Sequence, residues 1–132
     1  MSIQTILTQF TGPYFVATVE GSLPRVRPFG LVLEYQGRLY FGVGDQKASY
    51  RQLVEQPALE ISAVDGEKNW LRIRGEAEFD EDPALLEEIF QLMPHLKPQY
   101  SQEGGPRLKP FYIKNGVAEI ASLTGDFQSF RF

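Results

Sequence analysis

Apolar and charged side chains alternate through residues 70–79, and this period of two predicts a half-buried β-strand. One face would carry Leu71, Ile73, Gly75, Ala77 and Phe79, and the other Trp70, Arg72, Arg74, Glu76 and Glu78. A strand with one apolar and one polar face is typical of an antiparallel sheet that covers a core on one side only.

The rest of the chain continues this pattern of short strands separated by turns and helices. Further strands are predicted at residues 14–20, 25–33, 38–43, 59–64, 111–114 and 117–122, with the first three as a meander. Helices are predicted at residues 2–10, 45–56 and 82–93, with Ser2, Asp45 and Asp82 as N-caps. The last two strands are predicted to hinge at Asn115-Gly116, and the chain ends in an extended tail. Such strands with helices at the joints indicate a mainly β fold with flanking helices, closed into a small barrel.

Composition excludes several classes of protein. The chain has 132 residues, which we interpret as a single domain, residues 1–132. Its net charge of −4 argues against general attraction to nucleic acid or a membrane surface. It has no cysteine and one histidine, which excludes thiol chemistry and any metal site built from cysteine or several histidines. With no membrane span or secretory signal apparent, we expect a soluble, cytoplasmic protein whose reactive chemistry comes from a bound cofactor.

The first candidate site is the strand around Pro24 and Pro28, where two arginines alternate with apolar residues. Arg25 and Arg27 would share one strand face, about 7 Å apart. Two neighbouring guanidinium groups favour an anion between them. The alternative is a solvated strand face whose arginines pair with Glu20 or Glu34.

The second candidate is the glycine-rich passage from strand to helix at residues 42–50. Gly44 precedes a helix whose first turn contains Gln46, Lys47 and Ser49. Free backbone N–H groups, a lysine and a hydroxyl at a helix start are suited to bind phosphate. The alternative is an ordinary capped helix with a surface lysine.

A third group lies on the polar face of the alternating strand. Trp70 beside Arg72 and Arg74 could stack on a planar ring or anchor a dimer. It could equally be a surface aromatic whose neighbours pair with Glu76 and Glu78. His95 follows a proline at a helix end, where we expect a solvated structural role.

The order of these elements resembles a known family. The run FVATVEGSLPRVRPFGLVLEYQGRLYFGVGDQKASYRQLVEQPALEISAV, followed by WLRIRGEAEF, is similar to the pyridoxamine 5′-phosphate oxidase-like, FMN-binding split-barrel proteins, especially their short bacterial members. The resemblance implies a six-stranded antiparallel Greek-key split barrel and a homodimer. One FMN would lie in each of two clefts at the subunit interface.

The same resemblance assigns roles to residues. Arg25 would meet the flavin phosphate or ribityl chain, and the ring would be lined by Arg27, Pro28 and Phe29. The strand-to-helix passage, which includes Gly44, would place Lys47 at the phosphate, with Gln46, Ser49 and Tyr50 nearby. Trp70 and Arg72, from the same subunit or its partner, would flank the ring.

The resemblance therefore implies an FMN-dependent oxidoreductase of unknown substrate. The run Arg107-Leu108-Lys109-Pro110 copies the letters of a substrate motif of the full-length oxidase, but it precedes a strand, so we do not extend the resemblance to the vitamin substrate. Two alternatives stay open. One is a non-catalytic carrier or sensor of a flavin, deazaflavin or haem, and the other is a structural dimer with a vestigial cleft.

Overall fold

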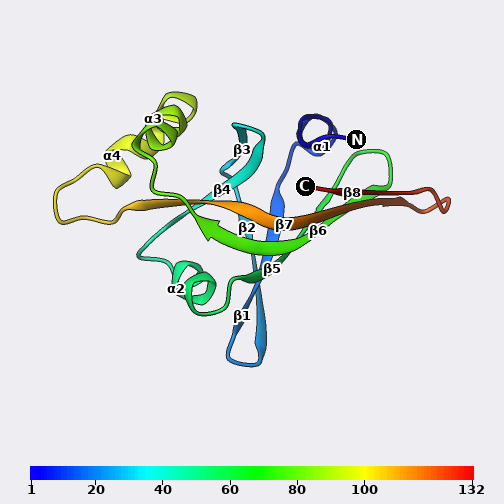
Figure 1. Cartoon of the computed structure of the whole chain (residues 1–132), viewed down its shortest axis with the longest axis horizontal. Coiled ribbons are helices and arrows are strands. Elements are labelled where there is room, and N and C mark those ends of the chain that lie inside the picture. The colour runs from blue at the N-terminus through cyan, green and yellow to red at the C-terminus, as the bar shows by residue number, and fades with distance from the viewer.

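One antiparallel sheet organises the whole chain (Figure 1). We describe it from a computed structural model that covers residues 1–132. The order of the strands across the sheet is β2-β1-β5-β6-β7-β4-β3, and β8 is an additional strand that pairs with β7. The strands are β1 (Tyr14–Glu20), β2 (Leu23–Phe29), β3 (Val32–Tyr35), β4 (Arg38–Gly44), β5 (Ala58–Val64), β6 (Asn69–Phe79), β7 (Leu108–Ser122) and β8 (Phe127–Arg131).

The mainly β architecture with flanking helices is confirmed, but the sheet is eight-stranded and does not close. The closed barrel and the three-strand meander were wrong, because β2 and β3 lie at opposite edges of the sheet. The single strand predicted for residues 25–33 is broken at Gly30 and Leu31. Phe29 packs into the larger of two cores and Leu31 into the smaller, so the chain passes between the two cores at this break.

β7 is the strand on which the split arrangement depends. Its first half pairs with β4, its second half pairs with β8, and β6 accompanies both halves. The two strands predicted on either side of a hinge at Asn115-Gly116 are one strand, since β7 runs through these residues. The register of β6 against β7 shifts between Arg74 and Glu76, so that Asn115 and Gly116 of β7 lie together opposite Gly75 of β6. The backbone of Gly116 pairs instead with Phe132. A β-bulge and the C-terminal residue therefore override the predicted hinge.

Two of the three predicted N-caps are found in the structure, and the third is not. They are α1 (Ile3–Gln9), α2 (Ala48–Glu55), α3 (Pro83–Leu92) and α4 (Lys97–Tyr100), with a 3₁₀ turn, η1 (Pro94–Leu96), before α4. Ser2 forms a capping box with Thr5, and Asp82 accepts a hydrogen bond from the N–H of Ala84, as their positions predicted. Asp45 does not cap α2: its carboxylate accepts from the backbone N–H of Arg107, and Lys47 holds the N-cap position.

The two cores meet near β4. The larger core lies against the main sheet and includes the apolar face of β6, with Leu71 and Ile73 fully buried. The smaller core joins α3 and α4 to β3 and the first half of β7. In Figure 1 α3 and α4 lie together at one end of the molecule, with α1 and β8 towards the other. No helix has the length and apolar character needed to cross a bilayer.

Candidate functional site

A pocket of about 270 Å³ opens where the two cores meet. It is enclosed by the end of β2, by β4, by the start of α2 and by the segment that contains η1 and α4. Its lining residues are Arg27, Pro28, Phe29, Gly30, Leu31, Gly42, Val43, Gly44, Lys47, Ser49, Met93, His95, Leu96, Tyr100 and Leu108.

Two glycines of β4 allow the walls of the pocket to approach one another. A Cβ on Gly42 would lie 2.2 Å from Cδ2 of Leu31. A Cβ on Gly44 would lie 2.6 Å from the hydroxyl oxygen of Tyr100 and 2.1 Å from Oε1 of Gln46. β4 therefore needs glycine at these positions so that Leu31 and Tyr100 can pack against its backbone.

The start of α2 forms the polar end of the pocket. Lys47, the N-cap, makes no side-chain capping bond, and the first turn contains no acidic residue. Ser49 is buried, and it lines the pocket. Backbone N–H groups at such a helix start have no intrahelical partner and carry the positive end of the helix dipole. This end of the pocket is therefore suited to an anion.

The charge of the pocket is opposite to that of the chain. Arg27 and Lys47 line it, and neither forms an ion pair. No aspartate or glutamate is among its lining residues, although the chain has 17 acidic and 13 basic side chains. Two cations thus face the pocket without a carboxylate to neutralise them.

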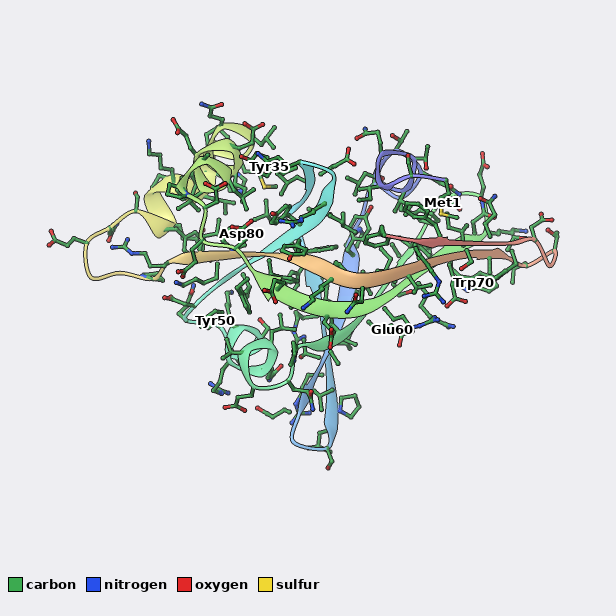
Figure 2. The ribbon with its side chains drawn as sticks, viewed as in Figure 1. Met1, Tyr35, Tyr50, Glu60, Trp70 and Asp80 are labelled. Atoms are coloured by element: carbon green, nitrogen blue, oxygen red, sulfur yellow. The ribbon has the colours of Figure 1, made fainter.

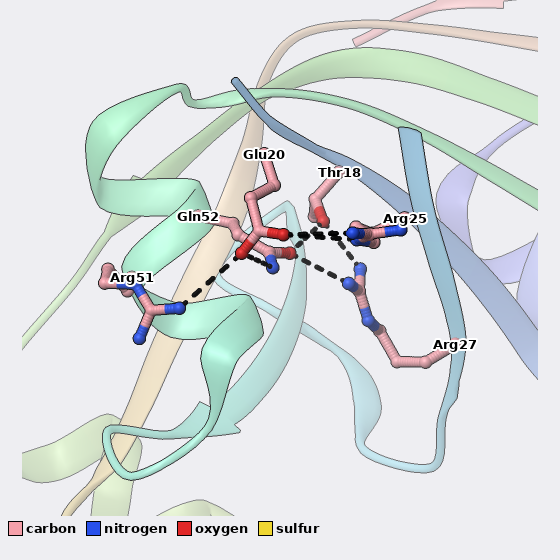
Figure 3. A network of polar contacts seen from close by, with 6 residues as sticks. All are labelled: Thr18, Glu20, Arg25, Arg27, Arg51 and Gln52. Atoms are coloured by element: carbon pink, nitrogen blue, oxygen red, sulfur yellow. Dashed lines mark hydrogen bonds and ion pairs between the residues drawn. The ribbon is translucent and has the colours of Figure 1, made fainter. Parts of the chain in front are cut away.

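The two arginines of β2 have different environments (Figure 3). Arg27 donates to the carbonyl oxygen of Val16, to Oγ1 of Thr18 and to Oε1 of Gln52. Partial burial lowers the pKa of its guanidinium.

Arg25 instead pairs with Glu20 at 3.2 Å and lies outside the pocket. Hydrogen bonds from Arg25 and Gln52 hold the pKa of the Glu20 carboxyl below its ordinary value. The solvated pairing with Glu20, considered for both arginines, therefore describes Arg25 only.

The pocket of a single chain brings together six of the predicted site residues: Arg27, Pro28, Phe29, Gly44, Lys47 and Ser49. Gln46 is exposed beside Gly44, outside the lining. Tyr50 points into the larger core, where its ring centroid lies 5.2 Å from that of Phe79. The single-chain pocket does not include Arg25, Gln46, Tyr50, Trp70 or Arg72, and their predicted contact with a cofactor stays a prediction.

Trp70 and Arg72 lie on the outer face of the sheet, away from the pocket. Figure 2 places Trp70 at the opposite end of the sheet from Tyr50, which belongs to α2. Arg72 pairs with Glu60 at 3.1 Å, and Arg74 pairs with Glu119. Their carboxylate partners lie on neighbouring strands rather than at the predicted positions 76 and 78. Trp70 lies in a cross-strand row with Val64, Ala121 and Phe127, which makes an apolar stripe on this face.

Sequence reasoning missed one whole wall of the pocket. Met93, His95, Leu96 and Tyr100 come from the end of α3, from η1 and from α4. Residues 93–110 read as the longest interruption between regular elements, and His95 as a solvated side chain. His95 is exposed, but it lies at the pocket. The apolar residues Met93 and Leu96 and the aromatic Tyr100 were the available signal, because such residues in a solvated loop need a surface to cover.

Comparison of the sequence with models of known protein families identifies the family of this chain. Residues 5–113 match the family model of pyridoxamine 5′-phosphate oxidase. The chain belongs to the pyridoxamine 5′-phosphate oxidase-like family. Among curated proteins, none matches the sequence.

Several solved structures share the fold. A NimC/NimA family protein from Clostridium acetobutylicum is 33% identical, with a TM-score of 0.87 over 98% of this chain and 89% of that one. A pyridoxamine 5′-phosphate oxidase-related, FMN-binding protein from Nostoc punctiforme is 15% identical, with a TM-score of 0.58 over 98% of this chain and 94% of that one. A haem-binding protein from Mycobacterium smegmatis is 16% identical, with a TM-score of 0.71 over 97% of this chain and 55% of that one. The last two similarities concern the fold alone.

Proposed function

We propose that this protein binds FMN in the pocket between β2, β4, α2 and α4 and acts as a flavin-dependent oxidoreductase. The observation that carries the proposal is the pair Arg27 and Lys47, which face the pocket with no carboxylate among its lining residues. A neutral ligand would gain nothing from two unpaired cations, whereas a phosphate group would neutralise them.

The parts of the pocket fit the parts of FMN. Lys47, Ser49 and the N–H groups at the start of α2 would hold the phosphate, together with Arg27. Leu31, Met93, Leu96, Tyr100 and Leu108 provide an apolar remainder for a flat ring system. The FMN-binding relative from Nostoc punctiforme supports the same cofactor.

We further propose that a second copy of the chain completes the site. The pocket volume of about 270 Å³ is below the range of roughly 300–1,000 Å³ that is usual for small-molecule sites. A second copy seated on the outer sheet face would cover the apolar stripe around Trp70 and Phe127, which is 60% exposed. In such a homodimer Trp70 and Arg72 could reach the partner's pocket, as the family resemblance implies.

Bound FMN would supply hydride and single-electron chemistry. The residues of this chain would position the cofactor by its phosphate and exclude water from the apolar part of the pocket. We place this activity in the cytoplasm, where reduced nicotinamide is available as a donor.

One alternative has an observation in its favour. His95 at the pocket would supply an imidazole ligand to haem iron, and a haem-binding protein shares the fold. The small pocket and its two cations favour FMN over the larger macrocycle. A flavin carrier or sensor without catalysis would use the same site and differs only in turnover.

The first experiment is the visible absorbance spectrum of purified protein, before and after incubation with FMN and desalting. We expect flavin bands at about one FMN per chain; a colourless protein that retains no FMN contradicts the proposal, and a Soret band supports haem.

Lys47→Ala should weaken binding of FMN much more than of riboflavin, which lacks the phosphate. Lys114→Ala, at an exposed lysine of β7, should leave both unchanged. Oxidation of reduced nicotinamide with an artificial acceptor then separates an enzyme from a carrier.

A further inference from the structure

The guanidinium of Arg27 is held only by neutral groups. Its three acceptors are a backbone carbonyl, the hydroxyl of Thr18 at 2.8 Å and the amide oxygen of Gln52 at 2.9 Å. Thr18 is 1% and Gln52 4% exposed. The three bonds fix the orientation of the guanidinium and leave some of its five donors free for a ligand. Arg27 is half-buried, and charged side chains that leave water are usually paired with an opposite charge, which here would cancel the charge of the guanidinium.

A carboxylate is nearby, but Gln52 stands between it and Arg27 (Figure 3). The amide nitrogen of Gln52 donates to Oε2 of Glu20 at 3.4 Å, while its oxygen accepts from Arg27 and from Thr18. A guanidinium can only donate and a carboxylate can only accept, so the side chain that joins them must do both. Glu20 is then neutralised on its far side by Arg25 and Arg51.

The position of Gln52 on α2 places this arrangement beside the start of the helix. Gln52 follows Ser49 by three residues, so the two side chains lie on the same helix face, and both are buried. Gln52 thus holds the guanidinium of Arg27 from α2, and Arg27 lines the same pocket as Lys47 and Ser49. Resting on the proposed function, we propose that Gln52 is a positioning residue. It fixes Arg27 beside the phosphate site and separates it from Glu20, so that the pocket selects a phosphate-bearing ligand.

Gln52→Glu tests this directly, because it replaces the neutral amide by a carboxylate of the same shape. The new carboxylate would pair with Arg27 and cancel the charge that a phosphate needs. We expect the Kd for FMN to rise about tenfold or more, and the Kd for riboflavin to change by less than about threefold. The ratio of the two constants is the informative readout, because a general loss of structure would weaken both ligands alike.

Two matched variants show whether the location of the new carboxylate or only the change in net charge affects FMN binding. Arg51→Gln changes the charge of the same helix by the same amount, but on the solvent side of Glu20 and outside the pocket, so FMN should bind nearly as in the wild type. The double variant Glu20→Gln/Gln52→Glu exchanges the amide and the carboxylate without changing net charge. It also avoids two adjacent carboxylates, which protects the fold. It should lose FMN as Gln52→Glu does.

A second measurement keeps this inference distinct from the identity of the cofactor. Inorganic phosphate at matched ionic strength should raise the Tm of the wild type and of Arg51→Gln, but not of Gln52→Glu or the double variant. If phosphate stabilises the wild type in this pattern while FMN is not retained, the role of Gln52 stands and the FMN proposal fails. Unchanged FMN affinity in Gln52→Glu, equal weakening of FMN and riboflavin, an equal effect of Arg51→Gln, or no response of the wild type to either ligand would overturn the role of Gln52.

Discussion

Gly44→Ala tests whether the close contact between β4 and α4 shapes the pocket. An added Cβ would lie 2.6 Å from the hydroxyl oxygen and 2.8 Å from Cε1 of Tyr100. Favourable contacts begin near 3.5 Å, so the ring must retreat by roughly 0.7 Å or more. Tyr100 is only 7% exposed and packs in the smaller core, so this retreat disturbs its neighbours. The nearby Gln46 is exposed and can move away at little cost.

The sign of the effect follows from two opposing contributions. Overpacking a core costs about 1–3 kcal/mol. Gly44 does not adopt a positive φ, so alanine there also restricts the unfolded chain, which stabilises by about 0.4–1 kcal/mol. We expect a net loss of about 1–2 kcal/mol, together with weaker FMN binding as Tyr100 moves into the pocket. In a Tyr100→Ala background the clash is absent, and Gly44→Ala should be neutral or stabilising.

The assay is urea denaturation followed by circular dichroism at one fixed protein concentration, with four proteins forming a double-mutant cycle. Gly66→Ala is the matched control, because Gly66 has neither a positive φ nor any atom within 4 Å of an added Cβ. That control should be neutral or slightly stabilising. If Gly44→Ala is as stable as the wild type, or costs the same with and without Tyr100, the close-contact reasoning is refuted.

Two further predictions concern charge and assembly. The lowered pKa of Glu20 means that its ionised form stabilises the fold above the ordinary value of 4.5 and that this contribution disappears as pH falls below it. Glu20→Gln should therefore lower the Tm at neutral pH, with the gap to the wild type closing in acid; a gap independent of pH would contradict this. Trp70→Asp on the outer stripe should shift a dimer towards monomer in sedimentation analysis and weaken FMN retention. Leu92→Asp, at an exposed leucine of α3, should do neither, and a dimer unaffected by Trp70→Asp would place the interface elsewhere.

Part of the fold is readable because it depends on neighbours along the chain. The alternation through residues 70–79 assigned each side chain of β6 to its observed face, since successive side chains point to opposite faces of any sheet. Ser2 and Asp82 marked helix starts because capping bonds join residues two or three positions apart. The strand-to-helix passage containing Gly44, Lys47 and Ser49 was likewise found from local spacing, and all three line the pocket.

The remaining features depend on contacts between distant segments. Arg25 and Arg27 are equivalent in the local pattern, but only Arg27 meets Gln52 of α2 and the pocket, while Arg25 meets Glu20. His95 enters the pocket because the smaller core holds η1 and α4 against β4. Sequence period fixes which way a side chain points from its own element. Which strands become neighbours, and therefore which cation is left without a carboxylate, is decided only when distant elements pack together.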